Sequence, residues 1–151
     1  MIYADSSFIC SCYVADVHSE KARAYLVKNE PRLPLVFLHW PELAKAVSAA
    51  SPDASRDWEA ICNDVQAGQK FYAAALDAER TGKRAAGLMR NFYSRWKKLR
   101  SLDVMHVAAA VESGGKAFLS FDSGSYQRVL AATQKLDVWP PLSDEEKLRL
   151  K

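Results

Sequence analysis

The sequence has little cysteine, and its three thiols indicate neither a disulfide framework nor a zinc site. Cys10, Cys12 and Cys62 form no C-x-x-C pair, and no cluster of His and Cys has the spacing of zinc ligands. An odd number of cysteines without these patterns is typical of small buried side chains in a reducing compartment. We therefore expect all three to be buried residues of a cytosolic protein.

Long apolar runs are also absent. No stretch of the chain approaches the about 18 apolar residues that a membrane span needs, and Asp5 interrupts the segment in which a signal peptide would be apolar. The 151 residues include 49% hydrophobic and 26% charged side chains, which is typical of one ordinary globular domain. We expect a single domain over residues 1–151, located in the cytoplasm and without a membrane partner.

Acidic residues are missing from one segment of the chain. The whole sequence has 21 basic and 18 acidic residues, a net charge of +3. Residues 80–102 hold eight basic residues and no acidic one, so the remainder has a net charge of −5. Such a basic strip favours a polyanionic partner. The candidates for phosphate contacts on this strip are Arg84, Arg90, Arg95, Lys97, Lys98 and Arg100.

Aromatic side chains lie within the same strip. Phe92, Tyr93 and Trp96 offer flat faces on which unpaired bases can stack. The spacing of Phe92 and Trp96 is equally typical of the buried face of a helix, and we favour that interpretation for these two residues.

Short apolar segments alternate with helical patterns along the chain. Strands are expected at 1–4, 35–38, 117–121 and 136–139, with a loop at 31–34. This alternation predicts an α/β three-layer sandwich in which helices cover both faces of a short parallel sheet. Helices are expected at 6–14, 19–27, 41–52, 53–67, 103–112 and 125–132, in most of 71–100 with a weak point at Thr81-Gly82, and in a final turn capped by Ser143 and Glu146.

Four carboxylates lie at the ends of these expected strands or at the starts of the expected helices. Asp5 and Asp122 come directly after expected strands, Glu42 lies in the first turn of a helix, and Asp103 opens the helix before strand 117–121. Each alone is explained by helix capping or by the helix dipole. Four carboxylates at one sheet edge would repel one another unless a divalent cation lay between them, and ligands that are all oxygen favour Mg²⁺ or Mn²⁺. Such a cation activates water for phosphodiester hydrolysis.

The segments around the four acids resemble a known family. YADSS at 3–7, LHWPEL at 38–43, SLDVMHVAAA at 101–110 and FLSFD at 118–122 are similar to the acidic motifs of PIN-domain ribonucleases, in particular the VapC-type toxins. The resemblance implies a Mg²⁺- or Mn²⁺-dependent endoribonuclease that acts as the toxin of a type II toxin–antitoxin pair. It further implies an RNA substrate, a homodimer and a cognate antitoxin. The catalytic and metal-binding residues that it implies are Asp5, Glu42, Asp103 and Asp122.

Two serines match or accompany the family's acids. Ser120 occupies a hydroxyl position of the last motif, and we expect it to hydrogen-bond a carboxylate or the metal-bound water, as Ser6 does for Asp5. Many relatives carry another acid soon after the last aspartate, but Ser123, Gly124 and Ser125 stand here. We therefore expect one metal ion rather than two.

Two histidines lie close to the predicted acids in the sequence. His106, one turn after Asp103, and His39 are interpreted as hydrogen-bonded core residues rather than catalytic ones.

A non-catalytic RNA-binding or interaction module of the same fold is an alternative, because the later acid is missing. A phosphatase with Asp5 as nucleophile is less favoured, since Ser7 replaces the second aspartate that such enzymes use.

Overall fold

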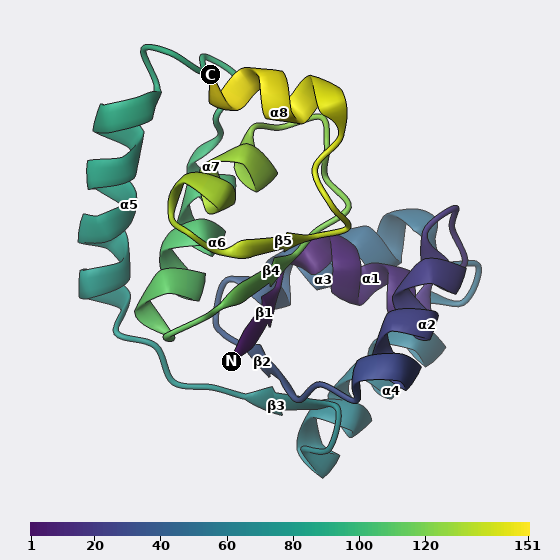
Figure 1. Ribbon diagram of the computed structural model, residues 1–151. Helices are drawn as coiled ribbons and strands as arrows, with labels where there is room; N and C mark the ends of the chain where they lie inside the picture. Colours follow the sequence, from purple (N-terminus) through teal and green to yellow (C-terminus); the bar gives the residue numbers. More distant parts are fainter. The chain divides into compact units, whose positions relative to one another are not determined.

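The fold is described from a computed structural model covering residues 1–151, which divides into two compact units (Figure 1). The N-terminal unit comprises Ala4–Ala75, and the C-terminal unit comprises Met1–Tyr3 with Leu76–Lys151. Short parallel strands alternate with helices in both units, which confirms the predicted α/β class. The single domain over residues 1–151 stays a prediction.

A three-stranded sheet of order β1-β4-β5 organises the C-terminal unit. Strand β4 (Ala117–Leu119) pairs in parallel with β5 (Asp137–Trp139), and Phe118 lies opposite Val138 in the register. Strand β1 (Ile2–Ala4) is the third member of the sheet and ends directly before Asp5, as predicted. The helices of this unit are α5 (Ala78–Phe92), α6 (Ser101–Glu112), α7 (Gln127–Thr133) and α8 (Asp144–Leu150).

The core of the C-terminal unit is built on aromatic stacking and small helical residues. The rings of Tyr3 and Phe118 stack with centroids 5.9 Å apart, and both side chains are fully buried. Helix α6 contributes Ala108, Ala109 and Ala110, which are also fully buried. The helix ends at the predicted glycine pair: Gly114 has a φ of +72°, and Gly115 donates its N–H to the carbonyl of Ala110.

The segment 71–100 differs from the prediction of a largely helical stretch. Residues Phe71–Ala73 form strand β3, and α5 runs unbroken through Thr81-Gly82. The buried hydroxyl of Thr81 donates to the carbonyl of Asp77, four residues earlier in the chain. The helix ends at Phe92, so Trp96 and Leu99 are buried from an irregular segment rather than from the expected helical face.

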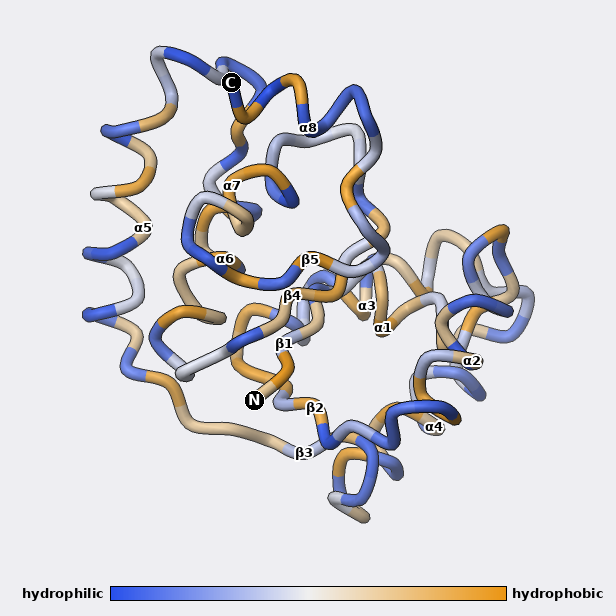
Figure 2. Tube along the Cα trace, viewed as in Figure 1, coloured by the Kyte–Doolittle hydropathy of each residue, from blue (hydrophilic) through white to orange (hydrophobic).

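Helix α5 is amphipathic. Thr81, Ala85 and Leu88 form its buried side, and its charged residues are exposed; hydrophilic positions recur along the helix in Figure 2. The basic residues of this helix are therefore exposed to solvent over three turns.

A parallel pair of strands organises the N-terminal unit. Strand β2 (Leu33–Leu35) pairs with β3, so the expected strand at 35–38 and the expected loop at 31–34 are both wrong by a few residues. Pro34 is accommodated because this sheet has only two strands, where a missing N–H is tolerated. The helices of this unit are α1 (Ser6–Tyr13), α2 (Ser19–Asn29), α3 (His39–Ala50) and α4 (Ala54–Ala67).

Cysteine burial agrees only in part with the prediction. All three thiols are free; Cys10 is buried, while Cys12 and Cys62 are half-buried. Burial raises the pKa of the Cys12 thiol to about 12, so it is protonated at neutral pH. None of the eight helices has the length and hydropathy required to cross a lipid bilayer.

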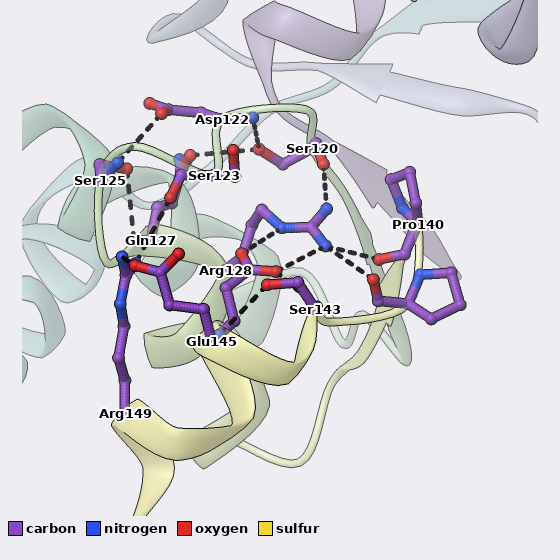
Figure 3. A network of polar contacts seen from close by, with 12 residues as sticks. Ser120, Asp122, Ser123, Ser125, Gln127, Arg128, Pro140, Ser143, Glu145 and Arg149 are labelled. Carbon is purple, nitrogen blue, oxygen red and sulfur yellow. Dashed lines mark hydrogen bonds and ion pairs between the residues drawn. The ribbon is translucent and has the colours of Figure 1, made fainter.

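The C-terminal helix is joined to the sheet by a buried ion pair. Arg128 donates to Glu146 at 2.8 Å and to the backbone carbonyls of Ser120 and Pro140 (Figure 3). Ser143 and Glu146 form the predicted capping box at the start of α8. Burial alone would raise the pKa of Glu146, but hydrogen bonds from Arg128 and Ser143 outweigh it and lower that pKa.

We predict that Glu146→Gln lowers the free energy of unfolding at pH 7 by about 3 kcal/mol, because it leaves a buried guanidinium without its anion. The lowered pKa means that the carboxylate's contribution is complete above its unfolded pKa and is lost as pH falls through the folded one. Glu146→Gln therefore also flattens the loss of stability below about pH 4.5, measured by urea unfolding across pH.

The neighbouring Glu145→Gln is the matched control. Its carboxylate is 78% exposed and pairs with Arg149 at the surface of α8, so we expect a change below about 0.5 kcal/mol. Equal losses for the two variants, or an unchanged acid slope in Glu146→Gln, would contradict the assignment.

Candidate active site

Two of the predicted acids, Asp103 and Asp122, are joined by one arginine in the C-terminal unit. Arg100 Nε donates to Asp103 Oδ2 at 2.8 Å, and its Nη2 donates to Asp122 Oδ2 at 3.0 Å. Asp103 lies in the first turn of α6, and its carboxylate side chain is 10% exposed, against 27% for that of Asp122. Both carboxylates therefore face a single planar cation.

The loop that carries Asp122 is held by serine hydroxyls. Strand β4 ends at Leu119, so Asp122 follows the strand by three residues rather than directly. Ser120 Oγ accepts the N–H of Asp122, and Asp122 Oδ1 accepts the N–H of Ser125 (Figure 3). These two bonds form a tight turn, which delays the start of α7 to Gln127.

Gln127 connects this loop to the helix of Asp103. Its Oε1 accepts the hydroxyl of Ser120 at 3.4 Å, and its Nε2 donates to the backbone carbonyl of Asp103 at 3.5 Å. Gln127 is 1% exposed, so its contacts lie in the interior. No pattern in the sequence indicates this role, because a glutamine at the start of a helix has many ordinary explanations.

The other two acids, Asp5 and Glu42, lie in the N-terminal unit. Asp5 caps α1 by accepting the N–H of Phe8 at 3.0 Å, and it also accepts the hydroxyl of Ser7 at 2.6 Å. Ser6 donates to Glu42 Oε1 at 2.9 Å. From the sequence, Ser6 is expected to hydrogen-bond Asp5, and that expectation is wrong. The hydroxyl of Ser7 donates to Asp5, and that of Ser6 donates to Glu42 on α3.

His39 supports this arrangement from the interior. Its Nδ1 accepts the N–H of Val36 at 2.9 Å, so Nε2 carries the proton and donates to the carbonyl of Ala4 at 2.8 Å. The ring thereby links Ala4, the residue before Asp5, to the turn before α3. Helix α3 begins at His39, two residues before Pro41. The structural interpretation of His39 is consistent with its complete burial.

His106 is likewise an interior residue. It is 1% exposed, and its Nδ1 lies 2.8 Å from the hydroxyl of Tyr3 in the core of the C-terminal unit. This contact agrees with its interpretation as a core histidine.

The basic strip contains fewer unpaired cations than the sequence suggests. Arg84 and Arg80 both pair with Glu112 of α6, and Lys83 pairs with Glu79. Arg95 and Lys97 lie over the rings of Trp96 and Tyr93, respectively. Arg90 and Lys98 form no ion pair, so they are the cations of the strip most available to a phosphate.

The donor chemistry of the four acids fits a hard cation. Within each unit, no group of three or more His, Cys, Asp or Glu side chains is placed to hold a metal ion. Each unit carries one pair of the predicted acids, and all four are carboxylates, the ligands that Mg²⁺ and Mn²⁺ prefer.

The structure has short parallel strands with helices, and the predicted acids lie at the start of helices or in a strand-end loop. The structure is similar to VapC20 of Mycobacterium tuberculosis, a toxin that cleaves the sarcin-ricin loop, with a TM-score of 0.67. That match has 13% sequence identity and covers 88% of this chain and 95% of VapC20.

A second solved structure supports the same fold. FitAcB from Neisseria gonorrhoeae matches with a TM-score of 0.60 and 16% identity, covering 93% of this chain and 98% of that one. No protein-family model and no curated protein sequence matches the chain. The likeness therefore lies in the fold, which confirms the PIN-like architecture that the four motifs indicated.

We predict that Tyr3→Phe lowers the free energy of unfolding by about 1–2 kcal/mol, because it removes the hydroxyl partner of a buried histidine nitrogen. Urea unfolding measures the change. Tyr93→Phe is the control, since Tyr93 is 45% exposed and its removal of a hydroxyl is expected to leave stability unchanged. Equal effects in the two variants would contradict the assignment of His106 to the core.

Proposed function

We propose that the protein is a metal-dependent endoribonuclease whose metal ligands are Asp5, Glu42, Asp103 and Asp122. The observation that carries this proposal is the pairing of Asp103 and Asp122 on one cation in a fold shared with VapC20. Two carboxylates that face the same positive group have the chemistry required to hold Mg²⁺ or Mn²⁺.

The roles of the protein groups follow from their contacts. The metal, when bound, supplies a Lewis acid and an activated water for attack on a phosphodiester. Asp103 and Asp122 would hold it from α6 and the strand-end loop, and Gln127 and Ser120 bond to the backbones of these two acids. Ser6 orients the carboxylate of Glu42, while Ser7 and the N–H of Phe8 orient that of Asp5.

The biological setting is part of the same proposal. VapC20 is described as a toxin, and the motifs of this chain resemble those of VapC-type toxins. We therefore assign to this protein a cognate antitoxin, a homodimeric state and a cytoplasmic location. One metal ion per site is expected, because Ser123, Gly124 and Ser125 follow Asp122 without a further acid.

The first test is cleavage of structured RNA by the purified protein with Mg²⁺ or Mn²⁺ and with EDTA. We expect cleavage only with metal, and a loss of at least about 100-fold in kcat/KM for Asp103→Asn and Glu42→Gln, because each removes a ligand charge. The matched controls are Asp137→Asn and Glu59→Gln, which change the same groups at exposed positions and should retain full activity.

Equal cleavage with metal and with EDTA would overturn the metal-dependent mechanism. In cells, expression of the wild type should arrest growth, and Asp103→Asn should relieve the arrest. If cells that express the wild-type protein grow normally although the purified protein cleaves RNA, the toxin role is contradicted and the nuclease activity is not.

The second test concerns the basic strip. Arg90→Ala and Lys98→Ala are expected to weaken RNA binding and to reduce the slope of log Kd against log salt by about 1 each, since each removes one phosphate contact. Fluorescence anisotropy in EDTA measures binding without cleavage. Lys116→Ala, an exposed lysine outside the strip, is the control and should bind as the wild type does. Unchanged salt slopes in the first two variants would contradict the assignment.

A non-catalytic RNA-binding module is the second candidate function. The absence of a further acid after Asp122 favours it. Salt-sensitive RNA binding without metal-dependent cleavage of several RNA substrates would establish this alternative.

A further inference from the structure

Arg100 occupies the position of a cation between two proposed metal ligands. Its guanidinium contacts Oδ2 of Asp103 at 2.8 Å and Oδ2 of Asp122 at 3.0 Å through two different nitrogens. The two carboxylates come from different elements, α6 and the loop after β4, so their proximity depends on tertiary structure. A positive charge at this position offsets the repulsion that two neighbouring carboxylates would otherwise have.

A divalent cation needs the same oxygen atoms. Mg²⁺ lies about 2.0–2.1 Å from its oxygen ligands, which is closer than either hydrogen bond of Arg100 to these carboxylates. A guanidinium and a divalent cation beside the same two oxygens repel each other strongly. The two cations therefore compete for Asp103 and Asp122.

Arg100 is able to leave. Its side chain is 67% exposed, in contrast to the 10% exposure of the Asp103 side chain that it contacts. Arg100 is also the residue directly before α6, so its side chain can rotate into solvent without disturbing a helical turn. A long exposed arginine thus changes position at little packing cost, whereas the turn holds the carboxylate of Asp122 and Gln127 holds the backbone of Asp103.

We propose that Arg100 is a built-in counter-ion that competes with the divalent metal for Asp103 and Asp122. In the metal-free protein it offsets one of the two negative charges of these acids, and metal binding displaces it into solvent. Arg100 thereby sets the metal concentration at which the site is loaded. This inference rests on the proposed function, since it assumes that these two acids are metal ligands.

The test measures Mn²⁺ binding to the full-length protein by isothermal titration calorimetry. Arg100→Gln is expected to lower the Kd for Mn²⁺ by about tenfold, because it removes a positive charge that contacts the same two carboxylate oxygens. Arg100→Lys keeps the charge and should bind Mn²⁺ within about threefold of the wild type. Lys116→Gln makes the same charge change at an exposed position outside the site and should leave the Kd unchanged.

The outcomes separate the inference from the function on which it rests. Mn²⁺ binding by the wild type with equal or weaker binding by Arg100→Gln overturns the inference alone. Failure of the wild type and Arg100→Gln alike to bind Mn²⁺ overturns both the metal site and the inference. Binding by Arg100→Gln alone, or tighter binding by it, supports the competition.

A measurement without metal tests the other half of the proposal. In EDTA, a double-mutant cycle of Arg100→Gln and Asp122→Asn on thermal unfolding should show coupling between the two residues. Saturating Mn²⁺ should cancel the destabilisation that the single substitution Arg100→Gln causes in EDTA, because the guanidinium then lies in solvent. A destabilisation that is unchanged by Mn²⁺, in a wild type that binds the ion, would show that Arg100 stays in place and would overturn the displacement.

Discussion

The repulsion between carboxylates is the constraint on which the arrangement of the C-terminal unit depends. Asp103 and Asp122 would not remain neighbours as bare charges in a partly buried position without a positive partner. Arg100 supplies that charge, and the surrounding polar groups hold the acids where the charge can reach them. The short turn after β4 positions Asp122, and the interior amide of Gln127 contacts the backbone of Asp103. Behind them, the buried pair of Arg128 and Glu146 fixes the carbonyl of Ser120 and joins α8 to the loop.

Two of the proposed metal ligands also lie at helix starts in this fold. Asp5 caps α1 and Asp103 lies in the first turn of α6, so the ordinary structural explanation of each acid is correct. That explanation does not compete with the functional one. A helix start places a carboxylate near a strand end with its orientation already fixed, which reduces the entropy that a metal ligand would lose on binding. Ser7 and the N–H of Phe8 illustrate this, since their bonds to Asp5 hold it in one orientation.

Local patterns predicted most helices and the α/β class, and they failed where long-range contacts decide. The capping box at Ser143 and the glycine stop after α6 follow from neighbouring residues, and both are present. Strand β3 was missed because its pairing with β2 joins segments nearly forty residues apart in the sequence. The partner of Ser6 was missed for the same reason, because Glu42 lies on another helix. Arg100 was assigned to RNA, although its i, i+3 spacing to Asp103 is a recognised ion-pair spacing on a helix.

The low identity to VapC20 and FitAcB shows which features of the chain carry the fold. A fold of this size requires apolar strands, helix caps and a core of suitable volume, and many sequences meet those requirements. The site is far more demanding, because each carboxylate needs a partner at hydrogen-bond distance and a compensating charge. The shared architecture depends on packing and shows the fold alone, whereas the four acids depend on charge and carry the proposed nuclease site. An arginine beside two of these acids adds a further requirement, namely that a divalent cation entering the proposed site must overcome the protein's own cation.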